Sequence, residues 1–278
     1  MSYETLMVQL ELGRSNAAPL GVARDVARRM GAAVTGAAAA RPLQTLVMAE
    51  GFYADNIVQE DTGSIDLEAR AAHEEFLAGL NGHAVALDWT MTVTHYPLSG
   101  QIAGATDTAD LVIVGMDRKS GEFSNSSRHV DVGDLVMQTG RPVLAVPMNV
   151  AEFHFRCAMV AWKECREARR ALADALPLLK HMERVVIAEV APADRQGAAQ
   201  ADLDRLVAWL GRHGISATSR LVPSGGDDGG GLLTLAEEIG ADLVVAGAYG
   251  HSRFREWVLG GVTRDLLHQN RRCLLLSH

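Results

Sequence analysis

Short, uninterrupted apolar runs alternate with amphipathic segments along this chain. A run such as LVVAG at 243–247 is typical of a strand that is buried on both faces of a parallel sheet. Segments with an apolar residue every three or four positions predict amphipathic helices; these are 167–179, 201–213 and 231–239. We expect the first helix to kink or end near Pro177, because proline cannot donate a backbone hydrogen bond. Gly214 and Gly240 are expected to end the other two.

The chain contains an internal repeat. ADLVIVG at 109–115 and ADLVVAG at 241–247 are identical at five of seven positions. In both copies a strand-like opening, a helical pattern and a second apolar run come earlier, and a short apolar run follows. The openings are 6–11 and 158–163, the second runs are 32–40 and 184–190, and the last runs are PVLAVP from Pro142 and CLLLS from Cys273. A period of roughly 130–150 residues is too long for a solenoid and suits two copies of one domain.

Strands that alternate with helices predict parallel βαβ units. We therefore assign the chain to the α/β class, as two tandem doubly wound parallel-sheet domains related by duplication. The expected domains are 1–150 and 151–278, and PMNVAEFHFR at 147–156 is the expected linker between them.

A glycine-rich stretch follows the predicted strand 243–246, and its glycines are Gly247, Gly250, Gly260 and Gly261. One interpretation is a tight turn with nothing bound. The other is a backbone whose amides contact a ligand, because ligands of open α/β sheets bind at the carboxyl ends of the strands. A helix that begins near Val262 or Thr263 would direct its free amides and positive dipole end at an anion such as phosphate. His251 and Arg253 would add hydrogen-bond donors or positive charge.

The spacing of glycine, two residues, glycine, nine residues and glycine resembles the nucleotide-binding members of the universal stress protein family. In those proteins a serine or threonine follows the last glycine, and Gly261 stands in its place here. The resemblance extends along 157–278 and more loosely along 1–150. It implies an adenine nucleotide alpha hydrolase-like fold, with ATP across the ends of the strands, accompanied by Mg²⁺ held mainly by phosphates and water.

The resemblance also implies contacts from the first two strands of the second copy. The first strand ends in Trp162, and Lys163 stands where the family has an aspartate or asparagine, so that adenine or ribose recognition is altered or the lysine reaches a phosphate. Val190 matches the position whose backbone meets the adenine. The indole of Trp162 itself is expected to pack against neighbouring elements. The candidate nucleotide contacts are therefore Trp162, Lys163, Val190, Gly247, Gly250, His251, Arg253, Gly260, Gly261, Val262 and Thr263.

The first copy lacks this motif. Gly115 is present, but Arg118, Arg128 and His129 occupy the positions where the rest of the motif is expected. The sequence thus predicts one degenerate half and one half that can bind a nucleotide.

Composition and charge argue against several classes of function. A net charge of −8 argues against general affinity for nucleic acid or an acidic membrane. Three isolated cysteines fit a reducing compartment, and no segment has the character of a signal peptide or a membrane span, so we expect a cytoplasmic protein. The histidines lack metal-ligand spacing, so no dedicated metal site is expected.

These patterns predict a stress-response protein that binds ATP in its C-terminal domain and acts as a sensor or regulatory module. One alternative is a partner-binding scaffold without nucleotide, favoured by Lys163 and Gly261. A slow ATPase that uses Lys163, His251 or Arg253 is the other. By the resemblance, PVLAVP and CLLLS pair within the chain as an internal pseudo-dimer, and a homodimer can form in addition.

Overall fold

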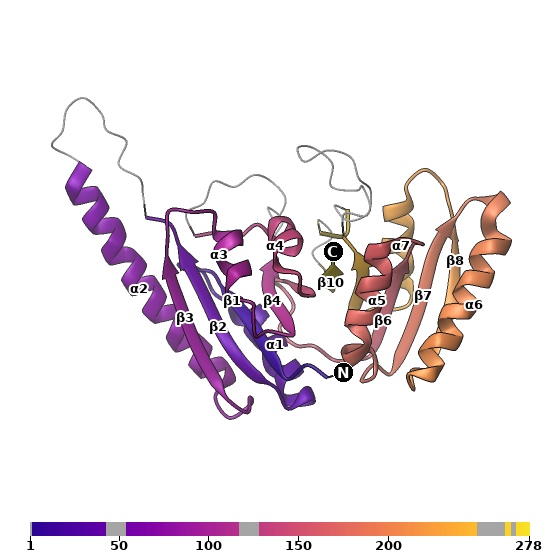
Figure 1. Cartoon of the computed structure of the whole chain (residues 1–278), viewed down its shortest axis with the longest axis horizontal. Helices are drawn as coiled ribbons and strands as arrows, with labels where there is room; N and C mark the ends of the chain where they lie inside the picture. The colour runs from indigo at the N-terminus through magenta and orange to yellow at the C-terminus, as the bar shows by residue number, and fades with distance from the viewer. Residues whose placement is uncertain (1, 43–53, 117–127, 249–264, 268–270) are drawn as a thin grey trace.

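The computed structural model describes residues 2–42, 54–116, 128–248, 265–267 and 271–278. Strands and helices alternate along the N-terminal half (Figure 1). The elements of this half are β1 Thr5–Leu10, α1 Ala17–Met30, β2 Ala33–Ala40, α2 Ala54–Leu80, β3 Leu87–Val93, α3 Leu98–Gly104, β4 Leu111–Met116, α4 Val132–Thr139 and β5 Val143–Pro147.

The C-terminal half repeats this order over the described residues. Its elements are β6 Cys157–Trp162, α5 Arg166–Leu179, β7 Arg184–Ala191, the 3₁₀ helix η1 Ala193–Arg195, α6 Gln196–Arg212, β8 Ala217–Pro223, α7 Asp228–Glu238, β9 Leu243–Gly247 and β10 Cys273–Ser277. The α/β class and the duplication predicted from the sequence are therefore confirmed.

All the described strands form one sheet in the order β3-β2-β1-β4-β5-β10-β9-β6-β7-β8. Within each half the strands are parallel, and the halves meet where β5 and β10 pair in antiparallel orientation. Leu275 lies opposite Leu144 in this pairing. The predicted pairing of PVLAVP with CLLLS inside one chain is confirmed, and Figure 1 shows the halves side by side around it.

An aspartate before the fourth strand of each half fastens the start of the first strand. Asp110 Oδ2 accepts two backbone N–H groups at the start of β1, at 2.8 and 3.0 Å. Asp242 Oδ2 accepts the equivalent two groups at the start of β6, at 2.8 and 3.1 Å. The repeated ADLV sequence therefore specifies the same aspartate hydrogen bonds in both halves, as well as a buried strand.

Apolar residues cover both faces of the sheet and form two core layers. Helices α1, α2, α5 and α6 bury their apolar sides on one face. Helices α3, α4 and α7 pack on the other. Of the described helices, including the 27-residue α2, none is sufficiently long and apolar to cross a bilayer.

The predicted helices exist, with shifted starts. Helix α5 ends at Leu179, two residues after Pro177, as expected. The other two begin earlier than predicted, at Gln196 and Asp228, because polar first turns weaken the apolar periodicity there. Gly240 adopts the expected left-handed conformation, with φ of 62°.

Strands β3 and β8 were not recognised in the sequence. Their residues, LDWTMTV and ATSRLVP, mix polar and apolar types because each strand lies at an edge of the sheet and is only partly buried. Edge strands therefore lack the continuous apolar run by which the central strands were identified.

The segment 148–156 crosses from β5 to β6 and is held by both halves. Asp25 of α1 accepts the buried backbone N–H of Phe153 at 2.9 Å. The guanidinium of Arg29 lies 4.9 Å from the ring centroid of Phe155, a residue with a left-handed φ of 55°. These contacts and the β5–β10 ladder join the two halves.

Candidate functional site

The strand order reverses once in each half, between β1 and β4 and between β6 and β9. At such a point the helices after neighbouring strands lie on opposite faces, which leaves room for a ligand at the carboxyl ends. Four of the predicted nucleotide contacts, Trp162, Lys163, Val190 and Gly247, lie at the second of these points, on the carboxyl edge of β6, β7 and β9.

Gly247 is the last residue of β9 and packs against the first turn of α5. A Cβ atom at this position would lie 2.4 Å from the backbone nitrogen of Ala168 and 2.5 Å from the carbonyl carbon of Glu167. Only glycine permits this approach of strand and helix. The close packing places the start of α5 directly beside the end of β9.

A buried carboxylate occupies the start of α5. The side chain of Glu167 is 8% exposed and bonds to Arg166, with Nη2 and Oε1 3.0 Å apart. Burial alone would raise the pKa of Glu167, but hydrogen bonds from its own backbone N–H and from Cys165, together with the charge of Arg166, lower it. The first turn of α5 therefore already holds an anion.

The carboxyl end of β6 carries two of the predicted contacts. Trp162 is 5% exposed and belongs to the core, as its expected packing role requires. The next residue, Lys163, is exposed, and its neighbour Glu164 is paired with Arg169. Val190 lies at the same edge, half-buried near the end of β7.

Glu189 is a functional candidate that sequence reasoning did not assign. It lies opposite Trp162 in the β6–β7 register. The Nε1 atom of Trp162 and the Oε2 atom of Glu189 are both buried and have no hydrogen-bond partner among the described residues. Burial and the nearby carboxylates of Asp202 and Glu164 raise the pKa of Glu189, while Arg195 opposes them. Its only signal in the sequence is an acidic residue inside an apolar strand, RVVIAEV.

We predict that Glu189→Gln stabilises the protein at neutral pH. The folded state binds the Glu189 proton more tightly than the unfolded state, so stability is lost as the pH rises through the interval between the ordinary carboxyl pKa and the raised one. The amide cannot ionise and avoids this loss. Urea unfolding should show a larger free energy of unfolding for the variant at pH 7 and equal values well below the ordinary carboxyl pKa of about 4. A variant that is less stable than the wild type at pH 7 would contradict the prediction.

The remaining predicted contacts lie outside the described residues. They are Gly250, His251, Arg253, Gly260, Gly261, Val262 and Thr263. Among the described residues, no group of three metal-ligating side chains is found.

Ion pairs fill the matching point of the N-terminal half. Arg128 Nη2 lies 2.8 Å from Asp61 Oδ1, and Arg128 Nε lies 3.1 Å from Glu68 Oε2. His129 is bonded to Glu11, which directly follows β1. Arg128 and His129 stand where the motif glycines are expected, and their side chains bridge β1, α2 and the segment before α4. The degenerate sequence thus corresponds to an edge that carries ion pairs among its described residues.

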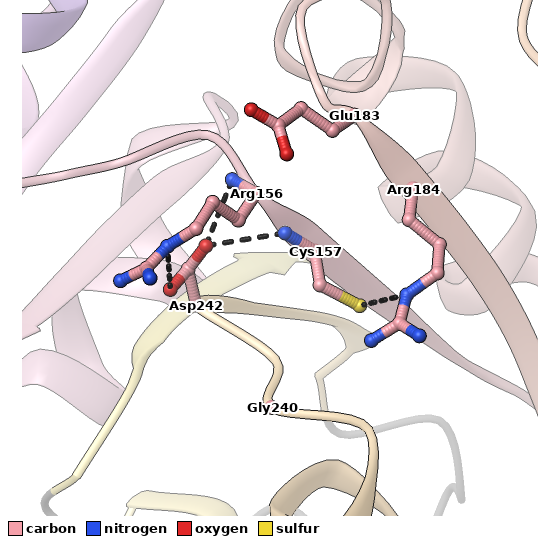
Figure 2. A pocket seen from close by; sticks show the side chains of 6 residues that line it. All are labelled: Arg156, Cys157, Glu183, Arg184, Gly240 and Asp242. Carbon is pink, nitrogen blue, oxygen red and sulfur yellow. Dashed lines mark hydrogen bonds and ion pairs between the residues drawn. The ribbon is translucent and has the colours of Figure 1, made fainter.

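Two cavities of the described structure lie at the opposite edge. One of about 540 Å³ opens at the amino ends of β6, β7 and β9, where Figure 2 shows its lining residues. Arg184 donates to Cys157 Sγ at 3.4 Å and to the carbonyl of Ile239 near the end of α7, and Asp242 is bonded to the start of β6. These polar groups fasten strand and helix ends to one another, and none belongs to the predicted site.

Residues 155–271 match the model of the universal stress protein family, and the match includes all four spaced glycines. The C-terminal half is a universal stress protein domain. No curated protein sequence matches the chain.

Solved structures extend the fold to the whole chain. A universal stress protein from Archaeoglobus fulgidus DSM 4304 is 16% identical, with a TM-score of 0.73 over 98% of this chain and 95% of that one. A putative universal stress protein from Pseudomonas aeruginosa UCBPP-PA14 is 13% identical, with a TM-score of 0.60 over 99% and 93%. The chain therefore carries two copies of the universal stress protein fold in tandem, and only the second also matches the family's sequence model.

Proposed function

We propose that the C-terminal half of this universal stress protein binds one adenine nucleotide, ATP, at the carboxyl edge of β6, β7 and β9. Binding would make the chain a stress sensor or regulatory module rather than a turnover enzyme. The observation that carries the proposal is the contrast between the halves. Gly247 and the spaced glycines remain in the half that matches the family model, whereas Arg128 and His129 pair with acidic residues at the equivalent point of the other.

The proposal gives each part of the nucleotide a place at this edge. The phosphates would bind the glycine-rich segment after β9, and the exposed Lys163 at the end of β6 would neutralise part of their charge. The base lies toward Val190, at the end of β7. Magnesium, when present, is held by the phosphates and water.

A second candidate function is a partner-binding scaffold. The buried and ionised Glu167 favours it, since this carboxylate repels any phosphate that approaches the first turn of α5. The two functions differ in one measurable property, which is the amount of nucleotide bound per chain.

Mass spectrometry of small molecules released from the denatured protein, followed by calorimetric titration with ATP and Mg²⁺, tests the proposal. We expect one adenine nucleotide per chain and a loss of affinity of about tenfold or more in Gly250→Val. Arg118→Val, at the same distance from Gly115 in the first half, is the matched control and should leave binding unchanged. Absence of binding at millimolar ATP in the wild type would favour the scaffold instead.

A further inference from the structure

Strand β3 forms one edge of the sheet, and its outer backbone groups have no partner strand among the described residues. Val34 donates to the carbonyl of Ala86 at 2.9 Å, and Thr94 donates to the carbonyl of Ala40 at 3.0 Å. In a parallel ladder, alternate residues bond to the same neighbour, so Asp88, Thr90 and Thr92 face β2. The N–H and C=O groups of the intervening residues point away from the sheet; these residues are Leu87, Trp89, Met91 and Val93.

Exposed apolar side chains gather at the same end of the molecule. Of the seven large apolar residues that are exposed in the described part of the chain, five belong to α2, to β3 or to the segments beside β3. They are Leu67, Leu77, Val85, Val93 and Tyr96. Leu77 follows His73 by one helical turn, and His73 stacks on Trp89 with ring centroids 4.8 Å apart. Leu77 therefore lies on the flank of α2 that covers β3.

The opposite edge of the sheet, β8, is protected in ways that β3 is not. Pro223 is paired with Ala191 in the β7–β8 register. Val93 of β3 occupies the equivalent position in the first half, opposite Ala40 of β2. Proline at an outward-facing position has no N–H to offer another strand. Arg220 of β8, which is paired with Ala188, is likewise equivalent to Thr90 of β3, which is paired with Ala37. Of the two equivalent edge strands, β8 therefore carries a proline and an arginine that hinder pairing with another strand, and β3 carries neither.

We propose that the edge of β3 binds the β3 edge of a second copy of this chain, giving a homodimer with one continuous sheet. The two β3 strands pair in antiparallel orientation about a twofold axis at Thr90. In this register Trp89 lies opposite the partner's Met91, and Leu87 lies opposite the partner's Val93. All four are outward-facing residues, so each pair exchanges two backbone hydrogen bonds.

The side chains favour a second copy over an unrelated strand because the register is self-complementary. Apolar residues meet on the α2 side of the sheet, and on the other side Asp88 lies opposite the partner's Thr92. The only charged residue of β3 therefore meets no like charge, which would destabilise a cross-strand pair. The pairing does not depend on nucleotide, since β3 lies outside the predicted site.

Sedimentation equilibrium over a range of protein concentrations tests this dimer. We expect a species of twice the chain mass for the wild type and a dissociation constant raised about a hundredfold by Val93→Pro, because the proline removes an outward N–H. Thr90→Lys, which places two ammonium groups on the twofold axis, should have the same effect. Both variants leave the hydrogen bonds to β2 intact, and thermal unfolding by circular dichroism checks that they fold.

The matched control lies on the other edge of the sheet. Ser219→Pro removes an outward N–H from β8 and should leave the dimer unchanged. A wild type that stays monomeric at every concentration overturns the proposal. A dimer that both β3 variants leave intact also overturns it, by placing the interface elsewhere.

Discussion

Gly247→Ala should lower the free energy of unfolding by about 3 kcal/mol, at the upper end of the range for added atoms in a packed interior. The new Cβ would lie 2.4 Å from the backbone nitrogen of Ala168 and 2.5 Å from the carbonyl carbon of Glu167. Both are backbone atoms of the first turn of α5, so no side-chain rotation relieves the contact. The end of β9 or the start of α5 has to move. Urea unfolding followed by circular dichroism measures the loss.

Gly115→Ala is the matched control, because Gly115 ends the same repeat in the first half. Its added Cβ would meet the Sδ atom of Met148 at 3.1 Å, and Met148 is a flexible, exposed side chain that can move aside. We expect a change within about 1 kcal/mol, with the lost glycine flexibility partly offsetting the contact. Equal losses in the two variants would falsify the assignment of Gly247 to helix packing.

Leu275→Asp should have the largest effect, a loss of about 4 kcal/mol or more in the free energy of unfolding. Leu275 is fully buried in β10 and is paired with Val245 on one side and Leu144 on the other. The substitution removes a core side chain and buries a carboxylate with no cation beside it. Because β10 joins the two halves, we expect both to lose stability together.

Leu67→Asp is the control for this effect. Leu67 is 69% exposed on α2, so the same change of residue type should alter the free energy of unfolding by no more than about 0.5 kcal/mol. Urea unfolding by circular dichroism reports the whole molecule, and Trp89 in the first half and Trp162 in the second contribute to a fluorescence readout. A Leu275→Asp variant that unfolds only its own half would show that β10 does not couple the halves.

Four of the predicted contacts lie together at one edge of the sheet, but the packing role of Gly247 was not predicted. Trp162, Lys163, Val190 and Gly247 do lie at one edge, because parallel strands present their carboxyl ends together. Gly247, however, is explained by its contact with α5, which no pattern of glycines reveals. Long-range packing of this kind depends on the angle and distance between two elements, and a local pattern carries neither.

The buried acids of the site were not predicted for the same reason. Glu167 reads as an exposed first-turn acid of an amphipathic helix, and it is buried because β9 and α5 approach so closely. The Oε2 atom of Glu189 is buried because its strand lies in the interior of the sheet, beside Trp162. A charged residue is normally placed at the surface, so its burial becomes visible only when the neighbours are in place.

In the N-terminal half, the sequence shows that the motif is lost, and the structure shows which residues pair with its replacements. The loss of the motif is visible in the sequence, since Arg128 and His129 replace glycine and small residues. Their partners are not, because Asp61 and Glu68 belong to a helix about sixty residues earlier in the chain. The structure alone shows that these substitutions place ion pairs at the edge.

By itself, the sequence determined the α/β class, the duplication and the central strands, and the resemblance to the universal stress protein family implied the pairing of PVLAVP with CLLLS. Continuous apolar runs and repeated letters are local signals of burial, and burial in a parallel sheet follows from them directly. The tertiary structure alone decided which strands form the edges, why Gly247 is a glycine, where Glu167 and Glu189 are buried, and which residues pair at the matching point of the first half. Each of these depends on distances between segments far apart in the chain, and such distances are set by the packing of the whole molecule rather than by any local pattern of residues.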